Sequence, residues 1–100
     1  MLWYDFPMTA SIDALFRPFS HGKLTLNSCL VMPPMTRAMS PGGVPTADVA
    51  RYYARRAKAG VGLIITEGAW IDDPLAGNDA NVPRLYGEDA LAGWRAVIEA

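Results

Sequence analysis

Two consecutive prolines, Pro33 and Pro34, constrain the fold of this chain more than any other feature. They follow the apolar residues 30–32 and precede Met35 and a polar pair. A proline lacks the N–H that the next rung of a β-ladder needs, so the pair predicts a short buried strand that ends here. Ligands of α/β proteins bind where strands end, and we therefore expect the segment after the prolines to lie at a binding site.

A helix and a second strand are predicted to follow. Residues 46–59 have helical periodicity, with Thr46 suited to the N-cap and Gly60 suited to the stop. The apolar positions of this helix are Val49, Tyr52, Tyr53 and Ala57. Residues 61–65 form a short, uncharged segment rich in β-branched residues, which is typical of a parallel strand buried on both faces.

A long loop and a second helix are predicted next. Residues 67–87 would form the loop, and a loop of that length leaving a strand end is expected to be functional. Glu88 and Asp89 suit the first turn of the following helix. Its apolar face would consist of Leu91, Trp94, Val97 and Ile98. No stop signal precedes Ala100, so we expect this helix to continue into a longer chain.

The amino-terminal part contains a predicted extension and a predicted hairpin. Residues 1–13 are interpreted as an extension in which Met8 would serve as well as Met1 for a start. Residues 15–26 predict a small hairpin with its turn at residues 20–22, whose expected role is to close one end of a larger body. The only histidine, His21, lies at that turn and is expected on the surface.

Composition excludes several classes of function. The net charge of −1 and the 51% hydrophobic content are ordinary for a globular protein and argue against a nucleic-acid-binding module. The basic residues of the first helix are interpreted as a solvated face. One cysteine and one histidine exclude an internal disulfide and argue against a metal site. No apolar run is long enough for a membrane span, and we expect a cytoplasmic protein.

The predicted order is therefore hairpin, strand, helix, strand, helix. Such an α/β arrangement leaves apolar strand edges exposed, and its simplest completion is a (β/α)8 TIM barrel. We expect residues 14–100 to be the amino-terminal part, the first quarter with two βα units, of that barrel, incomplete at its carboxyl terminus.

Five short blocks resemble the Old Yellow Enzyme family of flavin-dependent ene-reductases, in the order and spacing of that family. The blocks are Leu15-Phe16-x-Pro18, Leu24-x-Leu26, Val31-Met32-x-Pro34-Met35-Thr36-Arg37, Tyr52-Tyr53-x-x-Arg56-Ala57 and Leu63-Ile64-Ile65-Thr66-Glu67-Gly68-Ala69. The resemblance implies an FMN-containing barrel that takes a hydride from NADH or NADPH and passes it to an activated alkene. Homo-oligomerisation of the full-length protein is left open.

The resemblance also implies residue roles. Pro34 and Met35 would pack on or beside the isoalloxazine ring, and the Thr36 hydroxyl would donate to its O4/N5 side. Gly68 would let the ring approach the backbone, with Ala69 beside it. Taken singly, Pro34 is more often a strand stop, Thr36 a capping or turn hydroxyl, and Gly68 a turn glycine. Arg37 and Glu67 both follow strand ends and are expected to pair with each other, without a catalytic role.

Some family features are absent or altered. Ser28-Cys29 stands where the family commonly has Asn-Arg, and Cys29 is expected to be a buried, inert thiol. No catalytic residue is expected within these 100 residues, because the family's substrate-anchoring pair, proton donor and phosphate-binding loops come later. Two alternatives stay open: a non-catalytic remnant or assembly partner, and the barrel of a dienoyl-CoA reductase-like flavin and iron–sulfur enzyme.

Overall fold

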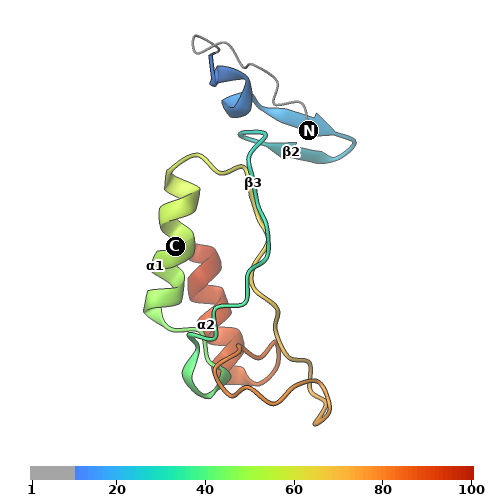
Figure 1. The fold of residues 1–100 in the computed structure, drawn as a ribbon, viewed down its shortest axis with the longest axis vertical. Coiled ribbons are helices and arrows are strands. Elements are labelled where there is room, and N and C mark those ends of the chain that lie inside the picture. The colour runs from blue at the N-terminus through green and yellow to red at the C-terminus, as the bar shows by residue number, and fades with distance from the viewer. Residues whose placement is uncertain (1–10) are drawn as a thin grey trace, which may run out of the picture.

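The computed structural model describes residues 11–100 as a chain of short strands and two longer helices (Figure 1). In chain order the elements are η1 (Asp13–Phe16), β1 (Phe19–His21), β2 (Leu24–Leu26), β3 (Val31–Met32), η2 (Pro41–Gly43), α1 (Ala47–Lys58), β4 (Leu63–Ile64) and α2 (Glu88–Glu99). The predicted α/β class is confirmed, whereas the assignment to barrel units stays a prediction. Of the predicted extension, residues 1–10, including both candidate start methionines, lie outside the described part.

The predicted hairpin is present, but its turn is shifted. Strands β1 and β2 pair antiparallel, with His21 opposite Leu24, so the turn consists of Gly22 and Lys23 rather than residues 20–22. Gly22 has φ +57°, a conformation that glycine adopts without steric cost. His21 is exposed, as expected. The hairpin lies at one end of the molecule, away from the two helices (Figure 1).

Strands β3 and β4 form the predicted parallel pair. Val31 lies opposite Leu63 and Met32 opposite Ile64, and the Ile65 N–H extends the ladder by donating to the Met32 carbonyl at 3.0 Å. The prediction that residues 61–65 are buried on both faces is wrong, because Leu63 and Ile65 are exposed. The pair is covered by helices on one side alone, so alternate residues point away from the core.

The same alternation corrects the expectation for Cys29. Ser28 and Met32 are buried on the helix side, whereas Cys29 and Val31 are exposed on the opposite side. The Cys29 thiol is directed to the hairpin segment, where it donates to the Arg17 carbonyl at 3.4 Å. The prediction of a buried thiol is therefore wrong for this chain.

Helix α1 begins and ends where the sequence predicts. Thr46 is at the N-cap position with extended backbone angles, but its side chain makes no capping hydrogen bond. Gly60 has φ +101° just after the helix, as a C-terminal stop requires. Val49 and Tyr53 are buried on the predicted face, whereas Ala57 is exposed.

Helix α2 begins at Glu88, after Gly87, but its buried face differs from the prediction. Trp94 and Val97 are buried as expected, whereas Leu91 and Ile98 are 49% and 84% exposed. The inward stripe instead starts at Ala90, which follows the i, i+4, i+7 spacing of a helix packed on one neighbour. The buried core lies between α1, α2 and the strands and contains Met32, Val49, Ala50, Tyr53, Trp94 and Val97.

The long segment between β4 and α2 is ordered by backbone pairing. Trp70 and Arg84 form an isolated parallel bridge, in which the Trp70 N–H donates to the Pro83 carbonyl and the Leu85 N–H to the Trp70 carbonyl. The Arg84 N–H donates to the Gly43 carbonyl at 2.8 Å. The segment is therefore attached to the loop that follows β3.

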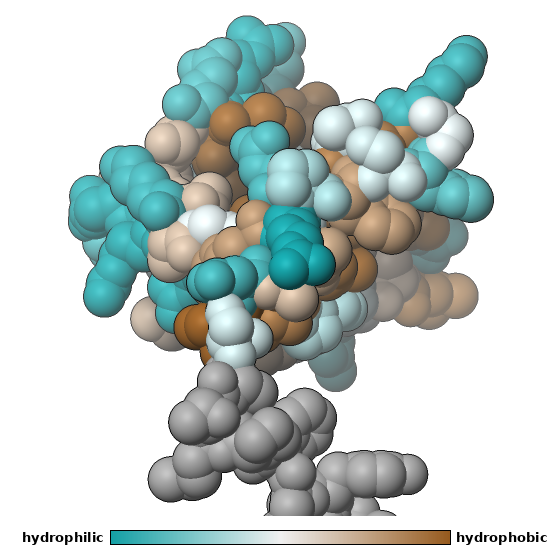
Figure 2. Space-filling view, turned by 90° about the horizontal axis from the view of Figure 1, so that it is seen from above, coloured by the Kyte–Doolittle hydropathy of each residue, from teal (hydrophilic) through white to brown (hydrophobic). Residues whose placement is uncertain are grey.

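The surface contains many apolar side chains. Seen from the hairpin end, hydrophobic residues are visible between polar ones (Figure 2). Exposed examples on the hairpin and η1 are Phe16, Phe19 and Leu24. Within residues 11–100, no helix has the length and apolar character needed to cross a membrane.

Candidate functional site

The two parallel strands bring the predicted site residues to one edge of the molecule. Pro34, Met35 and Thr36 follow β3, and Gly68 and Ala69 follow β4. Because β3 and β4 are hydrogen-bonded neighbours that run in the same direction, both segments leave the pair at its carboxyl end. Two segments that are some thirty residues apart in sequence thus meet at one place.

Most of these residues are open to solvent. Pro34 and Thr36 are exposed, and the side chain of Met35 is 47% exposed. A Cβ added to Gly68 would have no atom within 4 Å, so the backbone there faces open space. Ala69 is half-buried and packs against the core. The segments offer apolar contact, one hydroxyl and an accessible backbone to a flat ligand, and their contact with such a ligand stays a prediction.

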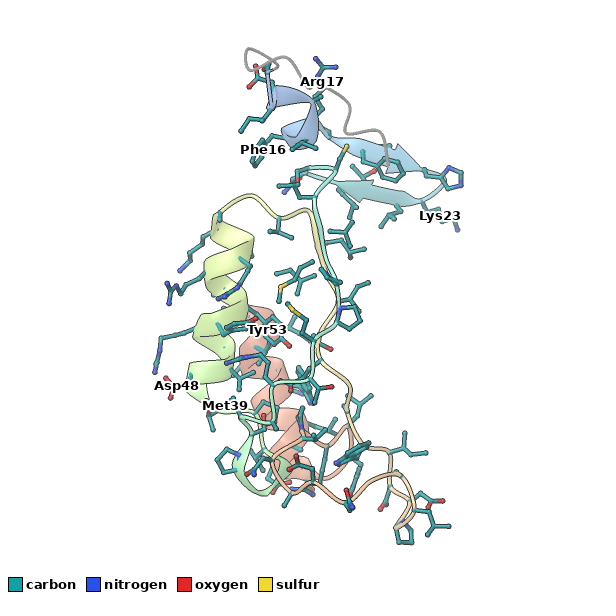
Figure 3. All side chains as sticks on the ribbon, viewed as in Figure 1. Phe16, Arg17, Lys23, Met39, Asp48 and Tyr53 are labelled. Carbon is teal, nitrogen blue, oxygen red and sulfur yellow. The ribbon has the colours of Figure 1, made fainter. Side chains whose placement is uncertain are left out.

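A buried carboxylate lies directly behind this edge. Glu67 is 2% exposed, and its Oε2 accepts a hydrogen bond from the Arg37 N–H at 3.0 Å. The Glu67 N–H donates to the Tyr53 hydroxyl at 2.9 Å. Figure 3 shows Tyr53 directed from α1 towards the strand segments. One acidic residue therefore joins the end of β3, the end of β4 and helix α1.

The expected pairing of Arg37 with Glu67 is present through the backbone and not through the guanidinium. The Arg37 guanidinium carbon lies 3.4 Å from the centre of the Tyr52 ring, and that of Arg56 lies 3.6 Å from the same centre. Both groups cannot occupy one face at these distances, so they enclose the ring from its two sides. Cation–π attraction of this kind also fixes the direction of the Arg37 side chain.

The environment of Tyr53 affects its acidity. Burial raises the pKa of the Tyr53 hydroxyl above its ordinary value of 10.0, and the negative charge of Glu67 acts in the same direction. The hydrogen bond from the Glu67 N–H and the charge of Arg37 oppose this rise without cancelling it. The hydroxyl therefore stays protonated at neutral pH and can accept the Glu67 N–H.

The sequence pattern identified Tyr53 as a core residue and missed its polar role. Its ring packs with Tyr52 edge to face, at 5.2 Å between ring centres, as a core aromatic pair does. The hydroxyl of a buried tyrosine needs a hydrogen-bond partner, and that requirement is the signal that could have pointed to the strand end.

A hollow lies beside the long segment that was predicted to be functional. It has a volume of about 270 Å³ and lies between the 42–43 turn and residues 70–86. The Trp70 indole N–H donates to the Asp79 carbonyl at 3.0 Å, and the Arg84 guanidinium pairs with Asp89. Two polar side chains that line this hollow, Trp70 and Arg84, are thus engaged with other groups of the protein. Within residues 11–100, no three His, Cys, Asp or Glu side chains come together as metal ligands.

Comparison with known proteins gives consistent matches. The model of a family described as NADH:flavin oxidoreductase / NADH oxidase matches residues 14–100. The chain is 37% identical over 86 residues to 12-oxophytodienoate reductase 7 of Oryza sativa subsp. japonica, covering 86% of this chain and 21% of that protein. It is 39% identical over 89 residues to enoate reductase 1 of Kluyveromyces lactis, covering 86% of this chain and 22% of that protein. It is 37% identical over 91 residues to "Probable inactive reductase easA" of Epichloe festucae var. lolii, covering 90% and 24%.

Solved structures match the same region. Morphinone reductase in complex with tetrahydroNAD superposes with a TM-score of 0.74 at 36% identity, covering 86% of this chain and 23% of that one. Old Yellow Enzyme from Pichia sp. AKU4542 gives a TM-score of 0.74 at 36% identity, covering 86% of this chain and 22% of that one. The chain thus spans about a fifth to a quarter of the length of these proteins.

Proposed function

The chain belongs to the NADH:flavin oxidoreductase / NADH oxidase family, and from that premise we propose that it forms one wall of the flavin-ring site of an FMN-dependent ene-reductase. It would serve as the amino-terminal quarter of a (β/α)8 barrel. The reaction would be hydride transfer from NADH or NADPH, through the flavin, to the C=C bond of an α,β-unsaturated carbonyl compound. The names of relatives, such as enoate reductase 1, support this reaction class.

The observation that carries the proposal is the meeting of two open segments at the carboxyl end of β3 and β4. Met35 supplies an exposed apolar surface, and Gly68 supplies a backbone that no side chain covers. Small-molecule sites are lined mainly by apolar side chains, with a few polar groups such as backbone N–H and C=O that orient the ligand. The residues present therefore fit an isoalloxazine ring, with Pro34 and Ala69 beside these two contacts.

Thr36 would supply the polar contact. Its side chain is exposed at the same edge. FMN, when bound, supplies the two-electron chemistry that amino-acid side chains lack. A hydrogen bond donated by the Thr36 hydroxyl to the O4/N5 side of the ring would stabilise the negative charge of the reduced flavin. Thr36 would thus tune the reduction potential and would not itself transfer the proton.

A non-catalytic protein is the second candidate. One relative is named "Probable inactive reductase easA", and the chain covers only 21–24% of the three relatives described above. In that case the chain would be a remnant or an assembly partner without flavin chemistry. A dienoyl-CoA reductase-like enzyme, with an iron–sulfur cluster and a second flavin domain, would share the same barrel.

The reading frame beyond codon 100 and a flavin titration test these candidates together. We expect further βα units with a paired-histidine motif downstream, and we expect the product of the complete frame to bind FMN and reduce an enone such as 2-cyclohexenone. Residues 1–100 alone should not quench FMN fluorescence at submicromolar concentrations. A stop codon directly after Ala100 would favour the remnant, and downstream cysteine clusters would favour the iron–sulfur enzyme. Submicromolar FMN binding by residues 1–100 would contradict the incomplete-site proposal.

A further inference from the structure

The carboxylate of Glu67 occupies an unusual place for an acidic side chain. It is almost fully buried, and one of its oxygens, Oε1, has no hydrogen-bond partner within residues 11–100. Burying a charged group is costly unless its hydrogen bonds compensate. The bond that Oε2 does make, to the Arg37 N–H, is charge-assisted and therefore stronger than a neutral one. Because burial of this side chain is costly, its role is expected to lie in the bond that its carboxylate makes, which fixes the position of the Arg37 N–H.

The bond from Arg37 acts on the neighbouring residue as well. The Arg37 N–H belongs to the planar peptide group that also contains the Thr36 carbonyl. Holding that N–H at 3.0 Å from Glu67 Oε2 therefore limits the rotation of the whole Thr36–Arg37 peptide. Thr36 is the residue whose hydroxyl is proposed to meet the flavin.

Helix α1 anchors both ends of this connection. The Tyr53 hydroxyl accepts the Glu67 N–H, which holds the residue directly before Gly68. The Tyr52 ring holds the Arg37 guanidinium by cation–π contact at 3.4 Å. Two adjacent tyrosines of one helix thus restrain the two segments that are proposed to contact the ring.

We propose that Glu67, held by Tyr53, is a positioning residue that orients the Thr36 peptide and hydroxyl for FMN. This inference rests on the proposed function, because it assigns Glu67 a role behind the same flavin-ring wall. Glu67 touches neither flavin nor substrate; it acts through the backbone of Thr36. Removing the Tyr53 hydroxyl should loosen Glu67 and misplace the Thr36 donor without changing any charge at neutral pH.

The first test measures FMN binding and reduction potential in the FMN-loaded protein that contains this chain. We expect Tyr53→Phe to weaken FMN binding about tenfold, a factor that corresponds to ~1.4 kcal/mol. We expect the midpoint potential of the flavin in this variant to fall by about 30 mV, which corresponds to a tenfold change in the equilibrium constant of a two-electron couple. Asp48→Asn, which changes an exposed acid on the same helix, is the matched control and should change neither quantity.

A double-mutant cycle tests the route through Thr36. If Tyr53 acts through the Thr36 hydroxyl, Tyr53→Phe should lower the potential in the wild-type background but not in a Thr36→Val background. An equal potential shift in both backgrounds would overturn the inference, as would an unchanged potential and FMN affinity in Tyr53→Phe alone.

Hydrogen exchange provides a readout that needs no flavin. In the FMN-free protein, the Arg37 amide should be protected in the wild type and should exchange about tenfold faster in Glu67→Gln, whose neutral amide accepts a weaker bond. An equally protected Arg37 amide in this variant would overturn the inference. A wild-type protein that binds no FMN would instead overturn the proposed function, so the two failures are distinguishable.

Discussion

At the scale of single residues, two glycines of this chain meet opposite surroundings. A Cβ added to Gly93, in the middle of α2, would lie 2.5 Å from the Pro45 carbonyl oxygen, a distance that real Cβ atoms do not reach. A Cβ added to Gly68 would lie in open space. The first glycine therefore serves helix packing, whereas the second is available for a ligand.

We expect Gly93→Ala to destabilise the protein although alanine is the better helix former. The propensity gain of about 1 kcal/mol should be outweighed by overpacking against Pro45, for a net loss of roughly 1 kcal/mol in the free energy of unfolding. Urea denaturation followed by circular dichroism measures this loss. Gly68→Ala is the control: its unfolding midpoint should be unchanged, while FMN binding should weaken. A stabilised Gly93→Ala would contradict the packing described here.

The hydroxyl of Thr36 is the residue-scale test of the proposed flavin site. Thr36→Val keeps the shape of the side chain and removes the donor, so the flavin potential should fall and reduction by NAD(P)H should slow. A hydrogen bond to a charged group contributes about 1.5–3 kcal/mol, equivalent to roughly 30–65 mV for a two-electron couple. Redox titration of the FMN-loaded protein measures the shift, and an unchanged potential would mean that the hydroxyl does not contact the ring.

At the scale of elements, the sequence predicts where a helix begins or ends better than which of its sides is buried. The end of α1 follows from Gly60, and the start of α2 from the acidic residues of its first turn, which are local signals. The exposure of Leu91 and Cys29 could not be predicted, because it depends on what packs against each element. The Glu67–Tyr53 contact was also missed, since it joins residues whose proximity arises only from the tertiary fold.

Helix α2 allows a direct comparison of a buried and an exposed apolar residue. Trp94 is 7% exposed, and its indole N–H donates to the Arg84 carbonyl, whereas Leu91 is about half exposed. We expect Trp94→Ala to lower the free energy of unfolding by about 3–5 kcal/mol and Leu91→Ala to change it by less than ~0.5 kcal/mol. Comparable losses in urea denaturation would mean that Leu91 is covered by a further part of the protein.

At the scale of the whole molecule, the chain is elongated. Its radius of gyration is 17.2 Å, compared with about 13 Å for a compact domain of 100 residues. The core lies on the helix side of β3 and β4, and the opposite side exposes Val31, Leu63 and Ile65. An apolar hollow of about 340 Å³ lies between the hairpin and these strands. Such apolar surface is typical of an interface.

The pH dependence of overall stability should depend on Tyr53. Burial, together with the charge of Glu67, raises the pKa of its hydroxyl, so the native state holds the proton more tightly than the unfolded state. The associated stability is fully present below the unfolded pKa near 10 and is lost as pH rises through the native pKa. We expect the wild type to lose more stability than Tyr53→Phe above pH ~10 in urea denaturation. Equal alkaline slopes would contradict this linkage.

The packing of α1 against α2 sets the order in which a nascent chain can fold. Val49 emerges from the ribosome well before Trp94, a residue of α2 that packs in the same core. At about 5–20 residues per second, synthesis leaves the apolar face of α1 without that partner for roughly 2–9 s. During this interval the apolar face of α1 lacks the cover that α2 provides in the folded protein, which makes the growing chain a candidate for chaperone binding.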